Sequence, residues 1–131
     1  MDGADPVRVY RTGRIPSWPV DAADLRSFVE FEEGDVVRRE VFESDRLFAQ
    51  TICLDRNASY GPVTDPASDA LLTILAGEAV FTLDRKRKRM KQWGAVLVRA
   101  GAEVVITNAS GEPLVILMVA SPPPTPGTVT D

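Results

Sequence analysis

The 131-residue sequence contains no histidine, and this absence restricts the chemistry that its side chains could perform. Hydrolysis by a serine or cysteine nucleophile with a histidine base is excluded, and we find neither a nucleophile elbow nor a phosphate-binding P-loop. The single cysteine, Cys53, stands between Ile52 and Leu54 and is predicted to be a buried, unreactive thiol in a strand. Any catalysis would depend on carboxylates, hydroxyls, amides and the shape of a pocket.

Charged residues are unevenly distributed, although the formal net charge is only −4. Residues 21–45 contain nine acidic side chains and three arginines, whereas residues 85–91 hold six of the fifteen basic side chains. The basic run could bind phosphate groups or nucleic acid, because each neutralised phosphate releases counterions. Alternatively, it is an exposed hairpin that faces the acidic segment 21–45 or a partner. Because few aromatic residues lie nearby, we favour the exposed hairpin and predict no nucleic-acid partner.

Short β-rich segments separated by turn residues dominate the chain from residue 28 onward. They cover residues 28–31, 36–42, 47–54, 71–75, 79–83, 88–92, 95–98, 104–108 and 114–119. Eight or nine strands at this spacing predict an all-β sandwich or barrel. Segment 114–119 is apolar at every position, so we expect both its faces to be covered, by a second layer or by the other subunit of a homodimer.

The two ends of the chain are predicted to lie outside the barrel. Residues 1–27 form an extended N-terminal arm, with a short strand at 7–11 and a helical turn at 20–25 capped by Asp21. The barrel then spans residues 28–120, and residues 121–131, with four prolines, form a flexible tail. We see no signal peptide and no apolar run of the roughly 18 residues that a membrane helix needs, so we expect a cytoplasmic protein without membrane contact.

Residues 57–84 resemble the first conserved motif of the cupin superfamily, which folds as a jelly-roll barrel or double-stranded β-helix. With Gly77 at the family's last glycine, the two histidine positions fall on Val63 and Asp65, and the glutamate position falls on Ala70. The first glycine position then falls on Asn57, a residue that tolerates left-handed backbone. A register one residue shorter would use Thr64, Pro66 and Ala58, which fit a turn less well.

Residues 93–119 resemble the second cupin motif, and the two stretches together cover about half of the chain. Gly101 and Asn108 keep the family's spacing, whereas the histidine position falls on Val104. Three imidazoles and a carboxylate hold the family's metal, and valine and alanine coordinate nothing. The resemblance therefore implies a cupin barrel with no metal and no other cofactor, since Asp65 alone would not hold a transition metal.

The cavity implied by the resemblance is mostly apolar and suits a small apolar or aromatic molecule. We expect the substrate-binding residues to be Gln50, Val63, Asp65, Ala70, Leu72, Ile74, Val104, Ile106 and Asn108. Gln50 and Thr51 face opposite sides of one strand, and the sequence leaves open which of them points inward. Among other residues, Trp93 and Met118 are expected in the core, and Arg38 and Glu40 on a solvated face.

Three functions stay open at this point. The first is a metal-independent protein that binds a small molecule. The second is a metal-free cyclase, isomerase or dehydratase of a biosynthetic pathway, with Asp65 and Tyr60 as catalytic, proton-handling groups. Asp65 could instead brace the turn between Pro62 and Pro66. The third is a structural interaction domain, which would have a filled barrel; a closed core would eliminate the first two.

Overall fold

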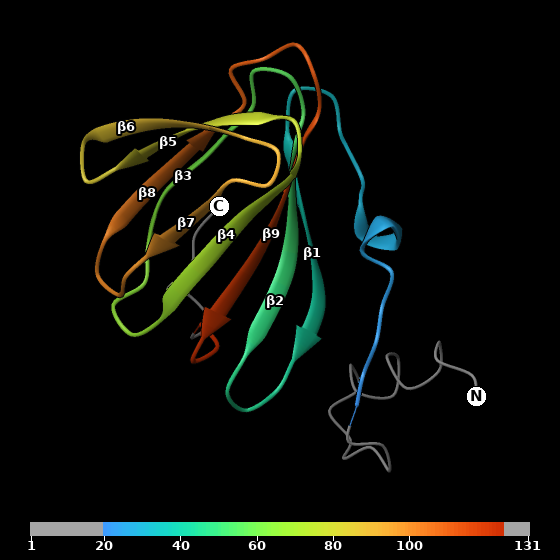
Figure 1. Cartoon of the computed structure of the whole chain (residues 1–131), viewed down its shortest axis with the longest axis vertical. Coiled ribbons are helices and arrows are strands. Elements are labelled where there is room, and N and C mark those ends of the chain that lie inside the picture. Colours follow the sequence, from blue (N-terminus) through green and yellow to red (C-terminus); the bar gives the residue numbers. More distant parts are fainter. Residues whose placement is uncertain (1–19, 125–131) are drawn as a thin grey trace.

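The computed structural model describes residues 20–124, and most of this region is β-structure (Figure 1). A short 3₁₀ helix, η1 (Leu25–Phe28), precedes the strands. Within the described residues the strands are β1 (Val36–Glu43), β2 (Phe48–Leu54), β3 (Ser59–Thr64), β4 (Asp69–Ala76), β5 (Glu78–Leu83), β6 (Lys86–Lys91), β7 (Ala95–Val98), β8 (Glu103–Thr107) and β9 (Leu114–Ser121). The expected strand at residues 7–11 lies outside the described residues. No helix within residues 20–124 is long and apolar enough to cross a membrane.

The strands of the described region form two antiparallel sheets that face each other (Figure 1). One sheet has the order β1-β2-β9-β4-β7, and the other has the order β3-β8-β5-β6. The chain passes repeatedly from one sheet to the other, as in a jelly roll. The predicted all-β fold is confirmed, and β9, which contains the apolar segment 114–119, lies between β2 and β4 at the centre of the larger sheet.

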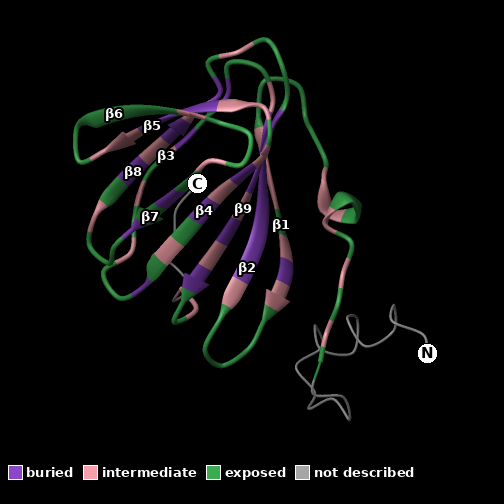
Figure 2. Ribbon diagram, in the orientation of Figure 1, coloured by how far each residue is buried: buried purple, intermediate pink, exposed green. Residues whose placement is uncertain are grey.

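The hydrophobic core fills the space between the two sheets, where the ribbon is coloured as buried in Figure 2. Phe81 on β5 is fully buried and pairs with Ile106 on β8, while Ile116 on β9 pairs with Ile52 and Ile74 on its two neighbours. Burying a side chain of this size stabilises the fold by about 1.5–3 kcal/mol. Side chains therefore fill most of the space between the sheets. A ligand could bind only where this space is not filled.

The segment before β1 differs from the expectation. Residues 28–31 were expected as a strand but are irregular beyond η1, which is capped by Asp24 instead of Asp21. The Asp24 carboxylate accepts a hydrogen bond from the Arg26 backbone N–H at 3.0 Å. The nearby Arg26 side chain holds the pKa of Asp24 below its ordinary value. The capping residue of the helical turn therefore lies three residues later than the sequence pattern suggested.

Strand β3 was not expected, because Gly61 and Pro62 lie within it and normally mark a break. The structure accommodates both residues because β3 is the edge strand of the smaller sheet. Its pairing with β8 shifts register between Tyr60 and Val63, so the proline interrupts no regular ladder. This strand matters for function, since it carries Tyr60 and Val63.

The start of β1 is tied to the end of β2 by Asp55. Its carboxylate accepts a hydrogen bond from the Gly34 N–H at 2.8 Å, and its own N–H donates to the Asp35 carbonyl at 3.1 Å. Backbone hydrogen bonds from Gly34 and Arg56 hold the pKa of the Asp55 carboxyl below its ordinary value. These contacts belong to the end of the barrel opposite to the cavity described next.

Candidate ligand cavity

A cavity of about 60 Å³ lies between the sheets at one end of the barrel. This is the end where β3, β7 and β9 finish and where β4 and β8 begin. Strand residues supply most of its apolar wall: Ile52, Tyr60, Val63, Ala70, Leu72, Val98, Val104, Ile106, Met118 and Ala120. Thr64, Asp65, Ser68, Arg99, Ala102 and Pro124 complete the lining near the surface. The barrel is thus not completely filled. A filled barrel was the expectation for a purely structural domain.

The four positions that the sequence resemblance aligns with cupin metal ligands all line this one cavity. They are Val63 and Asp65 at the end of β3, Ala70 on β4 and Val104 on β8, where Val63 and Val104 are directly paired. Asn57 has φ of 65°, as the chosen register requires. Three further expected residues, Tyr60, Leu72 and Ile106, share the cavity wall.

These residues do not fit a transition metal. Three of the four ligand positions hold hydrocarbon side chains, which have no donor atom. Within residues 20–124 no three histidine, cysteine, aspartate or glutamate side chains are close enough to hold a metal ion together. The only acidic residue in the cavity lining is Asp65.

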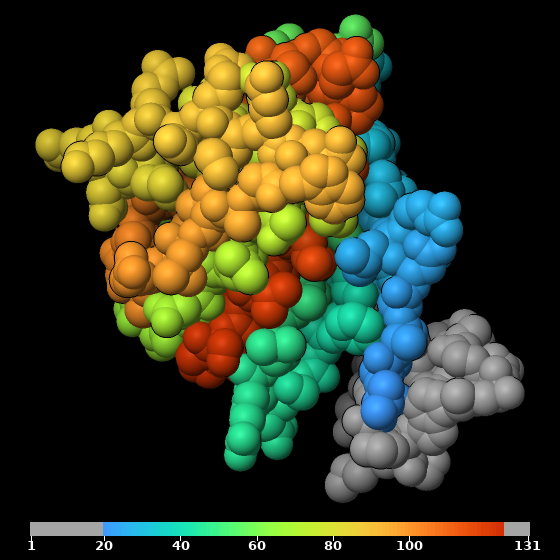
Figure 3. Space-filling view, in the orientation of Figure 1, coloured from blue at the N-terminus to red at the C-terminus, as the bar shows by residue number. Residues whose placement is uncertain are grey.

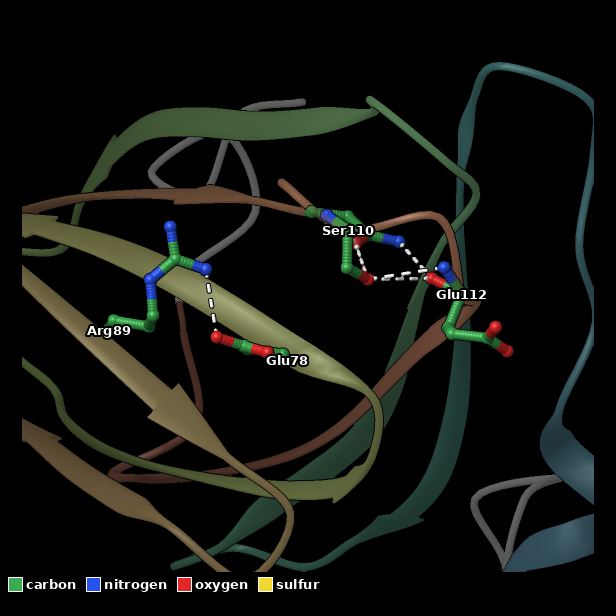
Figure 4. A network of polar contacts seen from close by, with 5 residues as sticks. Glu78, Arg89, Ser110 and Glu112 are labelled. Atoms are coloured by element: carbon green, nitrogen blue, oxygen red, sulfur yellow. Dashed lines mark hydrogen bonds and ion pairs between the residues drawn. The ribbon is translucent and has the colours of Figure 1, made fainter.

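Asn108 does not contribute to the cavity, contrary to the expectation. Its side chain is fully buried at the opposite end of the barrel. The Nδ2 group donates to the carbonyls of Leu54 at 3.1 Å, Asp55 at 3.2 Å and Glu112 at 2.7 Å. The Oδ1 atom accepts from the N–H and the hydroxyl of Ser110, which also contacts Glu112 (Figure 4). Asn108 is therefore fully occupied in joining β2, β8 and the loop to β9.

Ile74 also lies outside the cavity lining, although it faces inward as expected. It is completely buried and packs in the filled part of the core. Strand alternation identified the correct face of β4 but did not reveal how far along the barrel the cavity extends. The cavity reaches Ala70 and Leu72 and stops before Ile74.

The open question about β2 is answered in favour of Gln50. Gln50 pairs with Met118 and shares a face with Ile52, which is in the core, whereas the Thr51 hydroxyl donates to the Phe28 carbonyl at 2.6 Å on the outer face. Gln50 is 4% exposed, and its Nε2 has no hydrogen-bond partner among the described residues. It lies beside the cavity wall but is not part of the lining.

Arg38 and Glu40 differ from the solvated positions expected for them. Register pairs Arg38 with Ile52 and Glu40 with Gln50, so both lie on the inward side of β1 and are only partly exposed. The Arg38 guanidinium donates to the Tyr60 hydroxyl at 3.1 Å and lies 5.4 Å from the centre of its ring. Arg38 thus fixes the position of Tyr60 from the edge of the larger sheet.

Asp65 has two carboxylate oxygens in different environments. Its Oδ1 accepts the N–H groups of Ala67 at 2.9 Å and Ser68 at 3.1 Å, and so braces the turn between β3 and β4. Its Oδ2 is buried and has no partner in the described part of the chain. The bracing role considered for Asp65 therefore uses one oxygen and leaves an acceptor beside the apolar cavity.

The loops around the cavity are held in place by hydrogen bonds. The Asp65 carbonyl accepts the Gly101 N–H at 2.8 Å, and the Ser68 hydroxyl donates to the Pro122 carbonyl at 2.5 Å. Thr64 and Arg99, which also line the cavity, are exposed, so the cavity reaches the molecular surface between these loops. Arg99 and Ser68 were not expected as site residues, because no periodic pattern marks loop positions.

Two further expectations for single residues have opposite outcomes. Met118 is buried and lines the cavity beside Leu72, but Trp93 is 74% exposed and lies outside the core. Cys53 is buried, as expected, and this burial raises the pKa of its thiol. Cys53 pairs with Val37 and Val115 on the face of β2 that points away from Ile52, so its sulfur takes no part in the cavity.

Solved structures of several other proteins share this architecture at low sequence identity. The protein TT1209 from Thermus thermophilus is 23% identical, with a TM-score of 0.75 over 80% of this chain and 100% of its own. A conserved protein with a double-stranded β-helix domain from Klebsiella pneumoniae is 17% identical, with a TM-score of 0.73 over 77% of this chain and 89% of its own. An RmlC-like cupin from Shewanella frigidimarina is 16% identical, with a TM-score of 0.64 over 72% of this chain and 82% of its own.

The chain has the cupin fold. No family model matches the sequence, and no curated protein matches it significantly. The expected cupin-type barrel is therefore confirmed by structural similarity. The sequence identity to these structures is low, and the comparisons of sequence gave no match. For this cupin-fold chain, function must be argued from the cavity itself.

Proposed function

We propose that this cupin-fold protein binds a small, largely apolar molecule in the cavity, without the help of a metal. The observation that carries the proposal is the unpartnered Oδ2 of Asp65 beside a mostly apolar wall. A buried acceptor without a donor is costly, by about 1–3 kcal/mol, and a ligand hydroxyl or N–H would satisfy it. The ligand class is thus an apolar group that carries one hydrogen-bond donor.

The size of the cavity limits what can enter it. Its volume of about 60 Å³ is well below the roughly 300–1,000 Å³ of pockets that enclose drug-sized ligands. Only a small branched or cyclic end of a ligand fits inside, and the remainder must lie between Thr64 and Arg99 at the surface. Metal independence is supported by the hydrocarbon side chains at Val63, Ala70 and Val104.

Isopropanol and acetone test this proposal as probes of nearly equal size, because only isopropanol carries a hydroxyl donor. We expect millimolar isopropanol to shift the NMR signals of the Val63, Ala70 and Val104 methyl groups, and acetone to bind about tenfold more weakly. Asp65→Asn keeps Oδ1 for the turn and replaces Oδ2 by a donor, so it should reverse this preference. The matched control is Asp69→Asn, whose carboxylate accepts the Ala100 N–H outside the cavity.

Two results would contradict the binding proposal. One is the absence of shifts for both probes. The other is an isopropanol response that is unchanged in Ala70→Phe, since this substitution fills the cavity. A preference for isopropanol that persists in Asp65→Asn would reject Asp65 as the acceptor.

Catalysis is the second candidate function, because Asp65 and Tyr60 both line the cavity. Two such groups could move a proton during a cyclisation, isomerisation or dehydration in which no redox change occurs. Turnover of a bound molecule by the wild-type protein, and its loss in Asp65→Asn, would distinguish catalysis from binding.

We also propose that the protein is a homodimer joined through the outer face of the larger sheet. Leu71 on β4 and Leu97 on β7 are directly paired there and are 44% and 50% exposed. Leu117 and Val119 of β9 continue this uncharged face. An apolar patch on the face of a sheet can pack against its own copy around a two-fold axis, because the same patch is then self-complementary.

Light scattering is expected to give about twice the 14.3 kDa mass of one chain. Leu71→Glu/Leu97→Glu should yield a folded monomer, because four carboxylates would then meet without partners. Leu47→Glu is the control, since Leu47 is similarly exposed at 43% but lies in the turn before β2. A wild-type mass near that of one chain would refute the dimer.

A further inference from the structure

The basic run at residues 85–91 belongs to a hairpin at an edge of the smaller sheet. Strands β5 and β6 pair without interruption from Glu78↔Lys91 to Leu83↔Lys86. The turn residues Asp84 and Arg85 both have positive φ, which suits a tight two-residue hairpin turn. Strand β6 is the last strand of its sheet, and the hairpin projects from the body in Figures 1 and 3.

Strand register divides the basic side chains between two faces. Arg87, Arg89 and Lys91 pair with Thr82, Val80 and Glu78, which puts them on the outer face of the sheet. Lys86 and Lys88 lie on the other face with Met90, which packs against the core. The Cα atoms of successive residues in this outer row are therefore about 6.7 Å apart, twice the rise of one strand residue.

Most of this positive charge is not neutralised. Arg89 forms an ion pair with Glu78 at 2.8 Å (Figure 4), and it is the only hairpin cation with an acidic partner among residues 20–124. The acidic segment that could have covered the hairpin surrounds β1 instead, at the edge of the other sheet. The hairpin is exposed, as favoured from the sequence, but within residues 20–124 no acidic side chain of segment 21–45 forms an ion pair with it.

An exposed aromatic residue closely follows the basic strand in the sequence. Trp93 follows Lys91 by two residues, and its backbone N–H donates to the Ile74 carbonyl at 2.8 Å, which fixes its backbone. Its φ is 75° and its side chain is 74% exposed. The shortage of aromatic neighbours, which argued against nucleic acid, reflected the expectation that Trp93 was buried.

We propose that the outer face of β6, together with Trp93, binds single-stranded nucleic acid. A single strand has a flexible backbone, so its phosphates can line up along a straight row of cationic side chains. Trp93 offers a face on which an unpaired base can stack. A narrow, projecting ridge favours a single strand over a membrane, because the rest of the chain has nineteen acidic and nine basic residues and would be repelled by an anionic plane.

Titration with a fluorescein-labelled oligothymidylate of about fifteen nucleotides tests the proposal by anisotropy. Arg87 and Lys91 are the two outer cations without an ion pair, so log K should fall against log salt with a slope of about −1.4, which is about sevenfold weaker binding at 200 mM than at 50 mM salt. Arg87→Ala/Lys91→Ala should remove most of this salt effect. The control Arg46→Ala/Arg56→Ala removes the same charge from exposed sites elsewhere and should leave the slope unchanged.

Tryptophan fluorescence gives a second measurement. Purely electrostatic binding would not change the Trp93 emission, whereas stacking of a base would. In a Trp18→Phe background the emission comes from Trp93, and stacking should quench it on addition of the unlabelled oligonucleotide. No binding at low salt, or equal binding by both double variants, would overturn the proposal. Tighter binding to phosphatidylserine vesicles than to the oligonucleotide, with a blue-shifted Trp93 emission, would overturn it in favour of a membrane.

Discussion

Asn108→Asp is expected to lower the free energy of unfolding by about 3–4 kcal/mol and the melting temperature by roughly 10 °C or more. The substitution preserves the shape of a fully buried side chain but replaces its only donor group. The Leu54, Asp55 and Glu112 carbonyls would then face a carboxylate oxygen. Guanidinium denaturation at fixed protein concentration measures the change, because dimerisation would make stability depend on concentration.

Ser110→Ala is the matched control for Asn108→Asp. Ser110 contacts only the acceptor side of Asn108, so its loss should cost about 1 kcal/mol. Asn108→Ala should destabilise the protein by an amount between the two, since it leaves the carbonyls unpaired without adding a charge. Asn108→Asp as stable as wild type at neutral pH would contradict the structural role assigned here.

Gly77→Ala is expected to destabilise the protein by about 3 kcal/mol. Gly77 connects β4 to β5 with φ of 91°, a region that residues with a Cβ rarely adopt. A Cβ there would also lie 2.5 Å from the Pro113 carbonyl oxygen and 3.0 Å from the Leu114 Cα. Both neighbours are backbone atoms, so the strand β9 would have to move away from its place.

Two other glycines separate the effect of a positive φ from the effect of a steric clash with the added Cβ. Gly34 has φ of 72° but nothing within 4 Å of an added Cβ, so Gly34→Ala should cost about 1 kcal/mol from conformation alone. Gly111 has neither a positive φ nor a close neighbour, and Gly111→Ala should be within about 0.5 kcal/mol of wild type. Equal melting temperatures for the three variants would refute the close approach at Gly77.

The fold was largely predictable because its strands are marked by turn residues at nearly every break. The exception is β3, where Gly61 and Pro62 indicate a break that tertiary pairing overrides at a sheet edge. Irregular residues 28–31 were mistaken for a strand because an apolar pattern over so short a segment carries little information about partners. In both β3 and residues 28–31 the outcome depends on which strand pairs with the segment, and the local sequence does not specify that partner.

The cavity was predictable only in part. The spacing of the two motifs placed Val63, Asp65, Ala70 and Val104 around one cavity, although no metal ligand remained to mark them. Strand alternation then extended the site correctly to Leu72 but wrongly to Ile74, because it fixes the face of a residue and not its depth along the barrel. Loop residues such as Arg99 carry no periodic signal at all.

The exposure of Trp93 could not be predicted either. A tryptophan next to a glycine turn is ordinarily read as a core residue, because its large apolar surface favours burial. Trp93 lies in the turn between β6 and β7, has a positive φ and is 74% exposed. Its exposure changes the interpretation of the basic run that precedes it in the sequence.

The two ends of the barrel have different roles: one holds the strands together and the other contains the cavity. Asn108 and Gly77 hold the strands in register at one end, and the cavity at the other end is walled by side chains that take no part in those contacts. Val63, Ala70 and Val104 can therefore be exchanged for residues of other chemistry without disturbing the ties on which the fold depends. Such a separation makes the barrel a reusable scaffold, in which binding specificity and even the presence of a metal are free to diverge while the architecture persists.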